Sequence, residues 1–201
     1  MAGVAERVGI AVQQVDAKEA LIALSRTDSL TGLYNRRDFV EAIEENLSEL
    51  TASGKRAALI YVDLNNFKDV NDTHGHNQGD AALRAAAKIM SDSAEADEMV
   101  GPIGGDEFAL WLSADSAAEA EGRAKRLTEQ AGALAEFSED LPATLGMAAG
   151  IALFEPDSNE EIDDLFARAD QAMYAVKRDP ERNFTLAPLA EKAPPAQMAT
   201  P

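Results

Sequence analysis

The segment 57–64 constrains the fold most, because it is an almost continuous apolar run, Ala-Ala-Leu-Ile-Tyr-Val-Asp-Leu, with a carboxylate near its end. A run of this kind, without polar alternation, is typical of a central strand that is buried on both faces. Ligand sites in open α/β sheets gather at the ends of such strands. Asp63 is therefore a candidate site residue, although an Asp at this place could also serve a turn or cap a helix.

A second constraint is the pair of glycines followed by a pair of acids at 104–107. Apolar segments 99–103 and 107–112 flank them, and paired glycines supply the positive φ angles of a tight hairpin. Pro102 cannot donate a ladder hydrogen bond, so its strand should be an edge or carry a bulge. Taken alone, the hairpin is either a solvated turn or a place where a cation and a phosphate are held.

Helical and strand patterns alternate along the rest of the chain. Asn35 is the expected cap of a helix that stops at Gly54, and a polar segment 65–78 precedes a helix over 79–90. Capping-box patterns at Ser116 and Ser158 predict two more helix starts. The other expected elements are an acidic loop 92–98, a helix to about 134, a strand 144–153, a helix with an apolar stripe over 162–176 and a short strand 183–186. This alternation predicts an α/β (α+β) domain of two or three layers.

The two ends differ from this pattern. Residues 1–26 have a heptad-like apolar stripe, Val8, Val12, Val15 and Ile22, which predicts a helical stalk or linker. Either a homodimeric coiled coil or a helix packed back on the domain would satisfy it. Residues 188–201 are rich in Ala and Pro and are expected to be a disordered tail. The main domain is therefore expected over 27–187.

Composition excludes several classes of function. The chain of 201 residues has a formal net charge of −18 and no cysteine. Nucleic acid and anionic membranes reward Lys and Arg, so neither is an expected partner. The lack of cysteine predicts a cytoplasmic location, and no apolar run approaches the ~20 residues of a membrane span. The net negative charge does not exclude a small anionic ligand, because a bound cation can outweigh the global charge at the site.

Four separated segments resemble the motifs of one family. The hairpin Gly104-Gly105-Asp106-Glu107-Phe108 resembles the signature of the GGDEF family, the diguanylate cyclases, and segments 28–39, 63–80 and 169–174 resemble its other motifs in the same order. The resemblance covers 27–185. It implies a central sheet similar to nucleotidyl cyclases and polymerase palms, flanked by helices. It also implies condensation of two GTP into cyclic di-GMP plus pyrophosphate, at a homodimer of half-sites.

The resemblance also implies roles for individual residues. Asp63, Asp106 and the backbone carbonyl of Leu64 would bind Mg²⁺ or Mn²⁺, two ions per active site. Asp106 would also assist deprotonation of the attacking hydroxyl. Glu107 is open between a second metal contact and a structural salt bridge, because adjacent strand residues face opposite sides.

The nucleotide contacts follow in the same way. Asn71 and Asp80 would bind guanine, and His76 would either contact the ligand or order its loop. The phosphates would meet a group made of backbone N–H groups, charged side chains and the hairpin glycines: Phe67, Lys68, Lys177, Arg182, Gly104 and Gly105. Lys68 is in addition a candidate for the catalytic set, together with Asp106 and Glu107.

The sequence departs from the family's pattern at several places, among them Asn65, where the family commonly has a second Asp. Pro102 stands where a basic residue is usual, and the segment 177–182 is one residue longer, so that Arg178 could substitute for Arg182. Segment 95–98 lacks the arginine of the product-inhibition site, which predicts no high-affinity binding of cyclic di-GMP there. Pro102 and the lengthened segment 177–182 keep a second hypothesis open, a degenerate domain that binds GTP or a protein partner with little or no turnover.

Overall fold

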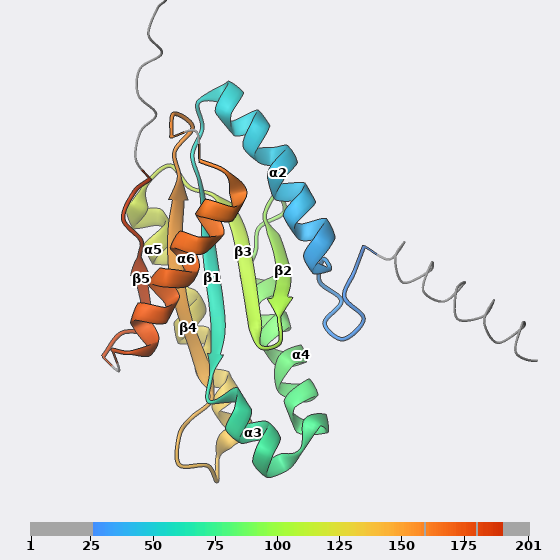
Figure 1. Ribbon diagram of the computed structural model, residues 1–201. Coiled ribbons are helices and arrows are strands. Elements are labelled where there is room, and N and C mark those ends of the chain that lie inside the picture. Colours follow the sequence, from blue (N-terminus) through green and yellow to red (C-terminus); the bar gives the residue numbers. More distant parts are fainter. Residues whose placement is uncertain (1–25, 159, 180, 191–201) are drawn as a thin grey trace, which may run out of the picture.

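The computed structural model describes residues 26–158, 160–179 and 181–190, which form one five-stranded sheet in the order β2-β3-β1-β4-β5 (Figure 1). The strands are β1 (Ala57–Asn65), β2 (Met99–Gly104), β3 (Glu107–Ser113), β4 (Gly146–Phe154) and β5 (Phe184–Leu186). β1 pairs antiparallel with both β3 and β4, β2 pairs antiparallel with β3, and β5 runs parallel to β4. The expected edge position of Pro102 is confirmed, with a shift of register between Pro102 and Gly104.

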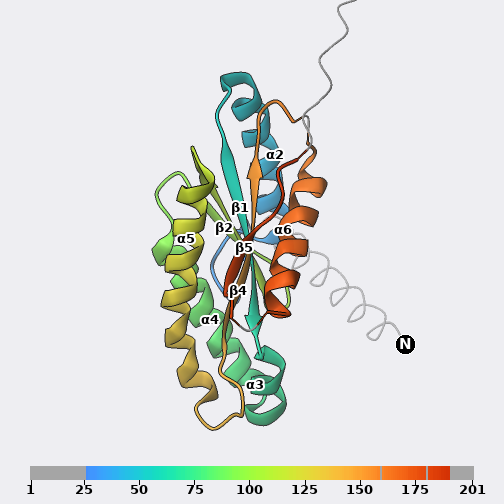
Figure 2. The ribbon, with the colours of Figure 1, turned by 90° about the vertical axis from the view of Figure 1, so that its left-hand side faces the viewer.

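Helices cover both faces of the sheet, so the domain has three layers (Figure 2). The helices are α2 (Arg36–Ser53), α3 (Phe67–His74), α4 (His76–Ser93), α5 (Ala117–Gln130) with the 3-10 helix η1 (Ala131–Ser138), and α6 (Ile162–Lys177). α2 and α6 lie on one face, and α4 and α5 lie on the other. Alternate residues of β1 enter two separate cores, Ile60 and Val62 in one and Leu59 and Tyr61 in the other. The predicted fold class is therefore confirmed, and β1 is buried on both faces.

Local signals explain where the first helix begins and ends. The Asn35 side chain accepts a hydrogen bond from the backbone N–H of Asp38 at 2.9 Å, as its predicted capping role requires. Gly54 ends the helix with a φ of 69°, which is favourable for glycine. Ser116 likewise caps α5 by accepting from the N–H of Glu119 at 3.3 Å.

Three expectations about elements were wrong. The polar segment 65–78 contains α3, which the periodicity missed because Val70 is its one buried residue. The capping box at Ser158 does not form: α6 begins at Ile162, and the Ser158 hydroxyl donates to the carbonyl of Glu155 at 2.7 Å. The helix expected to reach about residue 134 ends at Gln130 and continues as η1. The tail beyond residue 190 and residues 1–25 lie outside the described residues.

Gly150 sets the position of α6 on the sheet. A Cβ atom at Gly150 would overlap the carbonyl oxygen of Ala169 and the backbone nitrogen of Met173, so only glycine lets α6 come this close to β4. Close packing here determines where the later residues of α6 lie relative to the end of β1. No helix among the described residues is both long and apolar enough to span a membrane.

Candidate active site

The end of β1 and the tip of the β2–β3 hairpin lie together. Asp63 is paired in register with Glu107 across β1 and β3, and the backbone N–H of Leu64 donates to the carbonyl oxygen of Asp106 at 3.2 Å. Asp106 lies in the hairpin turn, one residue before β3 begins. The structure thus brings together Asp63, Leu64 and Asp106, which the sequence placed in one metal site.

Acidic side chains outnumber basic ones at this end of β1 and the hairpin. Burial raises the pKa of Asp63, the Lys177 ammonium opposes that shift, and the charges of Asp106 and Asp170 add to it. Burial also raises the pKa of Glu107, opposed by its hydrogen bond with Tyr61 and reinforced by nearby carboxylates. The pKa of Tyr61 is itself raised, first by burial and then by Glu107. We call Asp63, Asp106, Glu107 and Asp170 the hairpin acid cluster.

The basic residues predicted for the phosphates have carboxylate partners. Lys177, near the end of α6, has its Nζ 2.5 Å from Oδ1 of Asp63. Arg182 pairs with Asp179 at 3.2 Å, and Lys68 lies 3.7 Å from Asp72 with a largely exposed side chain. The structure therefore brings Lys177 to the cluster, while Arg182 and Lys68 contact acids close to them in sequence.

The predicted guanine contacts lie on α3 and α4. Asn71 packs directly against α4, because a Cβ atom on Gly79 would overlap the side-chain oxygen of Asn71. Asp80 follows at once and is partly exposed, with Arg84 at 3.9 Å, and His76 is the exposed first residue of α4.

The chain turns from β1 into α3 at Asn66, which has a φ of 64° and whose side chain donates to the carbonyl of Thr144 at 2.8 Å. This turn makes Phe67 and Lys68 the first residues of α3. The first-turn N–H groups of a helix have no intrahelical acceptor. The backbone of both residues is therefore suited to an anionic group.

A cavity of about 240 Å³ opens beside the hairpin. Its walls include the apolar side chains of Leu30, Leu83 and Phe108 together with Gly104 and Gly105, and Asp28, Thr31, Arg36, Pro102 and Ile103 complete the lining. Apolar side chains and the hairpin glycines thus share this lining with two charged residues, Asp28 and Arg36. Asn71 and Asp80 are not among its lining residues, so the structure does not join those two side chains to this cavity.

A larger cavity of about 840 Å³ runs between α2 and α6. Tyr61, Phe166 and Asp170 contribute to it, and it shares Arg36 and Ile103 with the hairpin cavity. The sequence had not singled out Tyr61, Asp170 or Arg36 as site residues. Asp170 lies in the motif segment 169–174, and Tyr61 lies in the apolar run 57–64. The polar group of each side chain was the signal that could have indicated a site residue.

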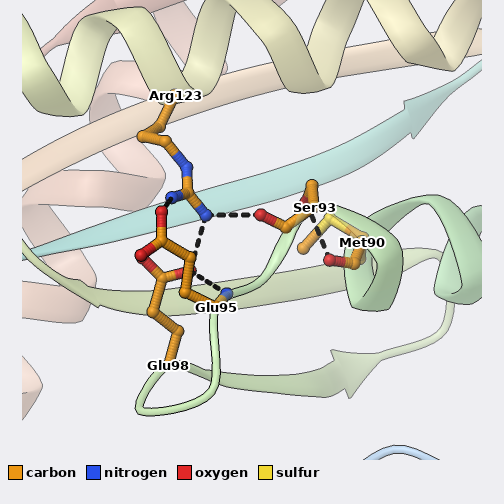
Figure 3. A network of polar contacts seen from close by, with 5 residues as sticks. All are labelled: Met90, Ser93, Glu95, Glu98 and Arg123. Atoms are coloured by element: carbon orange, nitrogen blue, oxygen red, sulfur yellow. Dashed lines mark hydrogen bonds and ion pairs between the residues drawn. The ribbon is translucent and has the colours of Figure 1, made fainter.

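The loop before β2, where the sequence lacks the arginine of the family's product-inhibition site, holds an internal ion-pair network (Figure 3). Arg123 of α5 reaches Glu95 with Nη1 at 2.8 Å, and its Nη2 lies 2.5 Å from both Glu98 and the carbonyl oxygen of Ser93. The side chains of Arg123 and Glu98 are only 9% and 5% exposed. Both carboxylates at the positions of the missing motif are therefore already neutralised from within the chain.

The oxygen donors at the hairpin fit a hard divalent cation. Two carboxylates, Asp63 and Asp106, and the carbonyl of Leu64 are the ligand types that Mg²⁺ and Mn²⁺ prefer. Among the described residues, no group of three or more His, Cys, Asp or Glu side chains is arranged to hold a metal. A site of two carboxylates and one backbone carbonyl agrees with that result, and the excess of acids is what a cation would offset.

Comparison with known proteins identifies the family. The family described as "Diguanylate cyclase, GGDEF domain" matches residues 25–183. The chain is 34% identical over 150 residues to the probable diguanylate cyclase DgcE of Escherichia coli strain K12, covering 75% of this chain and 14% of DgcE. It is 33% identical over 175 residues to the diguanylate cyclase DgcM of the same strain, covering 87% of this chain and 41% of DgcM. The chain belongs to the GGDEF family, as the resemblance predicted.

A solved structure supports the same conclusion. The coiled coil and GGDEF domain of DgcB from Caulobacter crescentus, in complex with c-di-GMP, matches with a TM-score of 0.71 and 26% identity, covering 92% of this chain and 98% of that one. The chain spans less than half the length of DgcE and DgcM.

Proposed function

We propose that this domain is a diguanylate cyclase, which joins two GTP molecules into cyclic di-GMP and releases two pyrophosphates. The observation that carries the proposal is the placement of Asp63 and Asp106 beside each other, tied by the bond between the N–H of Leu64 and the carbonyl of Asp106 at 3.2 Å. Family membership and the names of the relatives support it.

Asp63, Asp106 and the carbonyl of Leu64 would hold the divalent metal, Mg²⁺ or Mn²⁺, with two ions per active site. A bound divalent cation would make the 3′-hydroxyl more acidic and offset charge on the leaving pyrophosphate. Asp106 would assist in accepting the hydroxyl proton. Glu107 faces Asp63 across β1 and β3, where it would serve either as a second metal contact or in a structural ion pair.

Each GTP would occupy one half-site. Asn71 and Asp80 would read the guanine edge with complementary donors and acceptors, and His76 at the start of α4 would border them. The backbone N–H groups of Phe67 and Lys68 would meet phosphate oxygens, with Lys177, Arg182 and the Lys68 side chain adding positive charge. Gly104 and Gly105 would allow the phosphate chain to approach the hairpin backbone.

Two copies of the domain must face each other, because the 3′-hydroxyl of one GTP attacks the α-phosphate of the other. The segment 1–26, with its heptad-like stripe, is the proposed means of dimerisation. Polar replacement of Val8, Val15 and Ile22 should lower turnover at low protein concentration. Activity per chain that stays constant through a dilution series of the wild type would contradict a dimer requirement.

The alternative is a degenerate domain that binds GTP without efficient turnover. The pairing of Arg182 with Asp179 favours it, because that arginine then points to a residue of its own loop. Incubation of pure protein with GTP and Mg²⁺, followed by chromatography, separates the two. Cyclic di-GMP supports the cyclase, whereas bound GTP without product supports the alternative.

A further inference from the structure

Arg36 lies at the hairpin because of how α2 packs on β2. It is the first residue of α2 and shares a helix face with Phe39, three residues later. Phe39 packs against Gly101, where a Cβ atom would come within 2.7 Å of its ring. Gly101 therefore lets the first turn of α2 approach β2 immediately before Pro102, and Arg36 extends from this contact toward the hairpin.

The guanidinium of Arg36 belongs to the wall between the two cavities. Arg36 lines the hairpin cavity with Gly104 and Gly105, and it lines the larger cavity with Tyr61 and Asp170. Its positive charge is close enough to Tyr61 to oppose the rise in that residue's pKa. The side chain therefore lies next to the hairpin acid cluster as well as beside the hairpin backbone.

Arg36 is also the basic side chain at the site that has no acid partner of its own. Among the residues that line the hairpin cavity it is the sole Lys or Arg, and the acid there, Asp28, already accepts from the N–H and the hydroxyl of Thr31 at 2.9 and 2.7 Å. Within the part of the chain that the structure describes, no ion pair or hydrogen bond engages the Arg36 guanidinium, whereas Lys68, Lys177 and Arg182 each have a carboxylate within 4.0 Å.

We propose that Arg36 is a further substrate-binding residue, which takes a phosphate group lying against Gly104 and Gly105. This inference rests on the proposed function, since it names an additional contact to the same nucleotide. A guanidinium can form two parallel hydrogen bonds to phosphate oxygens. No atom lies within 4 Å of a Cβ built on Gly105, so the hairpin backbone is open to such a group.

The adjacent Arg37 provides a matched control. It has the same charge and lies on the same helical turn, but its Nη2 is 3.2 Å from Oδ2 of Asp38. Arg37→Ala removes one positive charge from α2 without removing the side chain that faces the hairpin cavity. Arg36→Gln keeps part of the aliphatic stem of Arg36 and a polar end group, but removes the positive charge.

The experiment is calorimetric titration of wild type, Arg36→Ala, Arg36→Gln and Arg37→Ala with three probes in the presence of Mg²⁺. The probes are a non-hydrolysable GTP analogue, guanosine and inorganic pyrophosphate. We expect both Arg36 variants to bind the GTP analogue and pyrophosphate about tenfold or more weakly, the loss of one charge-assisted contact, while guanosine binding stays unchanged. Arg37→Ala should stay within about twofold of wild type for every probe.

Two results would overturn the inference. One is unchanged affinity of both Arg36 variants for the analogue and pyrophosphate. The other is an equal loss for guanosine, which would mean that Arg36 supports the fold of the site. Thermal unfolding of each variant checks that the domain is intact. If wild type itself does not bind the GTP analogue, the proposed function fails, and this outcome is distinct from a wild type that binds and an Arg36 variant that binds equally well.

Discussion

Two clusters of acidic side chains in this domain differ in how far basic side chains neutralise them. In the network around Arg123, one guanidinium contacts Glu95, Glu98 and a backbone carbonyl, so that the buried carboxylate of Glu98 has a partner. In the hairpin acid cluster, Lys177 contacts Asp63, yet burial, with neighbouring carboxylates adding to it, still raises the pKa values of Asp63 and Glu107. The Arg123 network lies in the loop before the β2–β3 hairpin, and the hairpin acid cluster lies at its tip. Their position near the same hairpin therefore does not explain the difference.

The difference lies in what completes each cluster. Buried charges that are paired and hydrogen-bonded within the chain stabilise one arrangement of the loop. Acids held together by the fold without enough bases carry an electrostatic cost, which is typical of sites that bind an external cation. Changes to the two clusters should therefore have different consequences, loss of stability in one and loss of activity in the other.

The largest expected effect is on activity, from Asp106→Asn in the hairpin acid cluster. This change removes a carboxylate from the proposed metal site, and we expect turnover of GTP to fall on the order of 10²–10³-fold. Chromatography of cyclic di-GMP measures it. Asp92→Asn, which changes an exposed acid paired with Lys88, serves as the control and should leave turnover unchanged. Wild-type product formation by Asp106→Asn would show that the metal assignment is wrong.

The second effect is on stability, from Arg123→Met in the balanced network. It leaves Glu98 buried without its partner, and we expect the free energy of unfolding to fall by about 3–5 kcal/mol. Chemical denaturation measures the change. Lys88→Met, at an exposed pair with Asp92, should cost less than about 1 kcal/mol. Equal losses in the two variants would mean that burial does not distinguish the Arg123 network from a surface ion pair.

A third prediction tests shape in place of charge. Gly79→Ala would push the side chain of Asn71 away from α4. If Asn71 contacts guanine, affinity for a GTP analogue should fall about tenfold, the loss of one hydrogen bond. Gly132→Ala in η1, where a Cβ meets nothing within 4 Å, should leave affinity unchanged. Equal affinity of the Gly79 variant and wild type would remove Asn71 from the guanine site.

The smallest effect concerns pH and Glu107→Gln. Because the pKa of Glu107 is raised in the folded state, the folded protein binds more protons than the unfolded chain between the two pKa values, and stability falls as pH rises through that interval. Glutamine lacks this cost, so the melting temperature of Glu107→Gln should exceed that of wild type at neutral pH. The difference should shrink toward about pH 4, where the wild-type carboxyl becomes protonated.

A surface acid provides the comparison for that experiment. Glu129→Gln, at an exposed pair with Lys125, should show no comparable gain at neutral pH. A Glu107 variant that is less stable than wild type at every pH would mean that the carboxylate stabilises the hairpin, contrary to the expected excess of acid.

Local signals in the sequence predicted much of the fold. The apolar run of β1, the glycine hairpin and the Asn35 cap each depend on residues close together in the chain. Helix α3 was not predicted because one buried side chain, Val70, gives no periodicity. The Ser158 pattern failed because its hydroxyl oxygen accepts from the N–H of Glu160, before the helix begins at Ile162.

Contacts that depend on packing across the sheet were not predictable in the same way. Lys177 and Asp63 are separated by 114 positions, and the approach of α6 that joins them depends on Gly150. Arg123 lies on α5, which follows β2 and β3 in the chain, whereas its partner Glu95 precedes both strands. Motif resemblance placed Asp63 and Asp106 in one site, but it did not indicate Tyr61, Asp170 or Arg36, whose positions follow from tertiary packing.

Pro102 has a consequence for how copies of this domain can associate. Sheet edges with free N–H groups are templates for strand addition and polymerisation. At one edge, β2 has a proline and a shift of register, and at the other edge β5 has only 3 residues. Neither edge offers a long ladder to a neighbour, so we expect copies to meet through side-chain surfaces, which leaves the hairpin tips free to face each other.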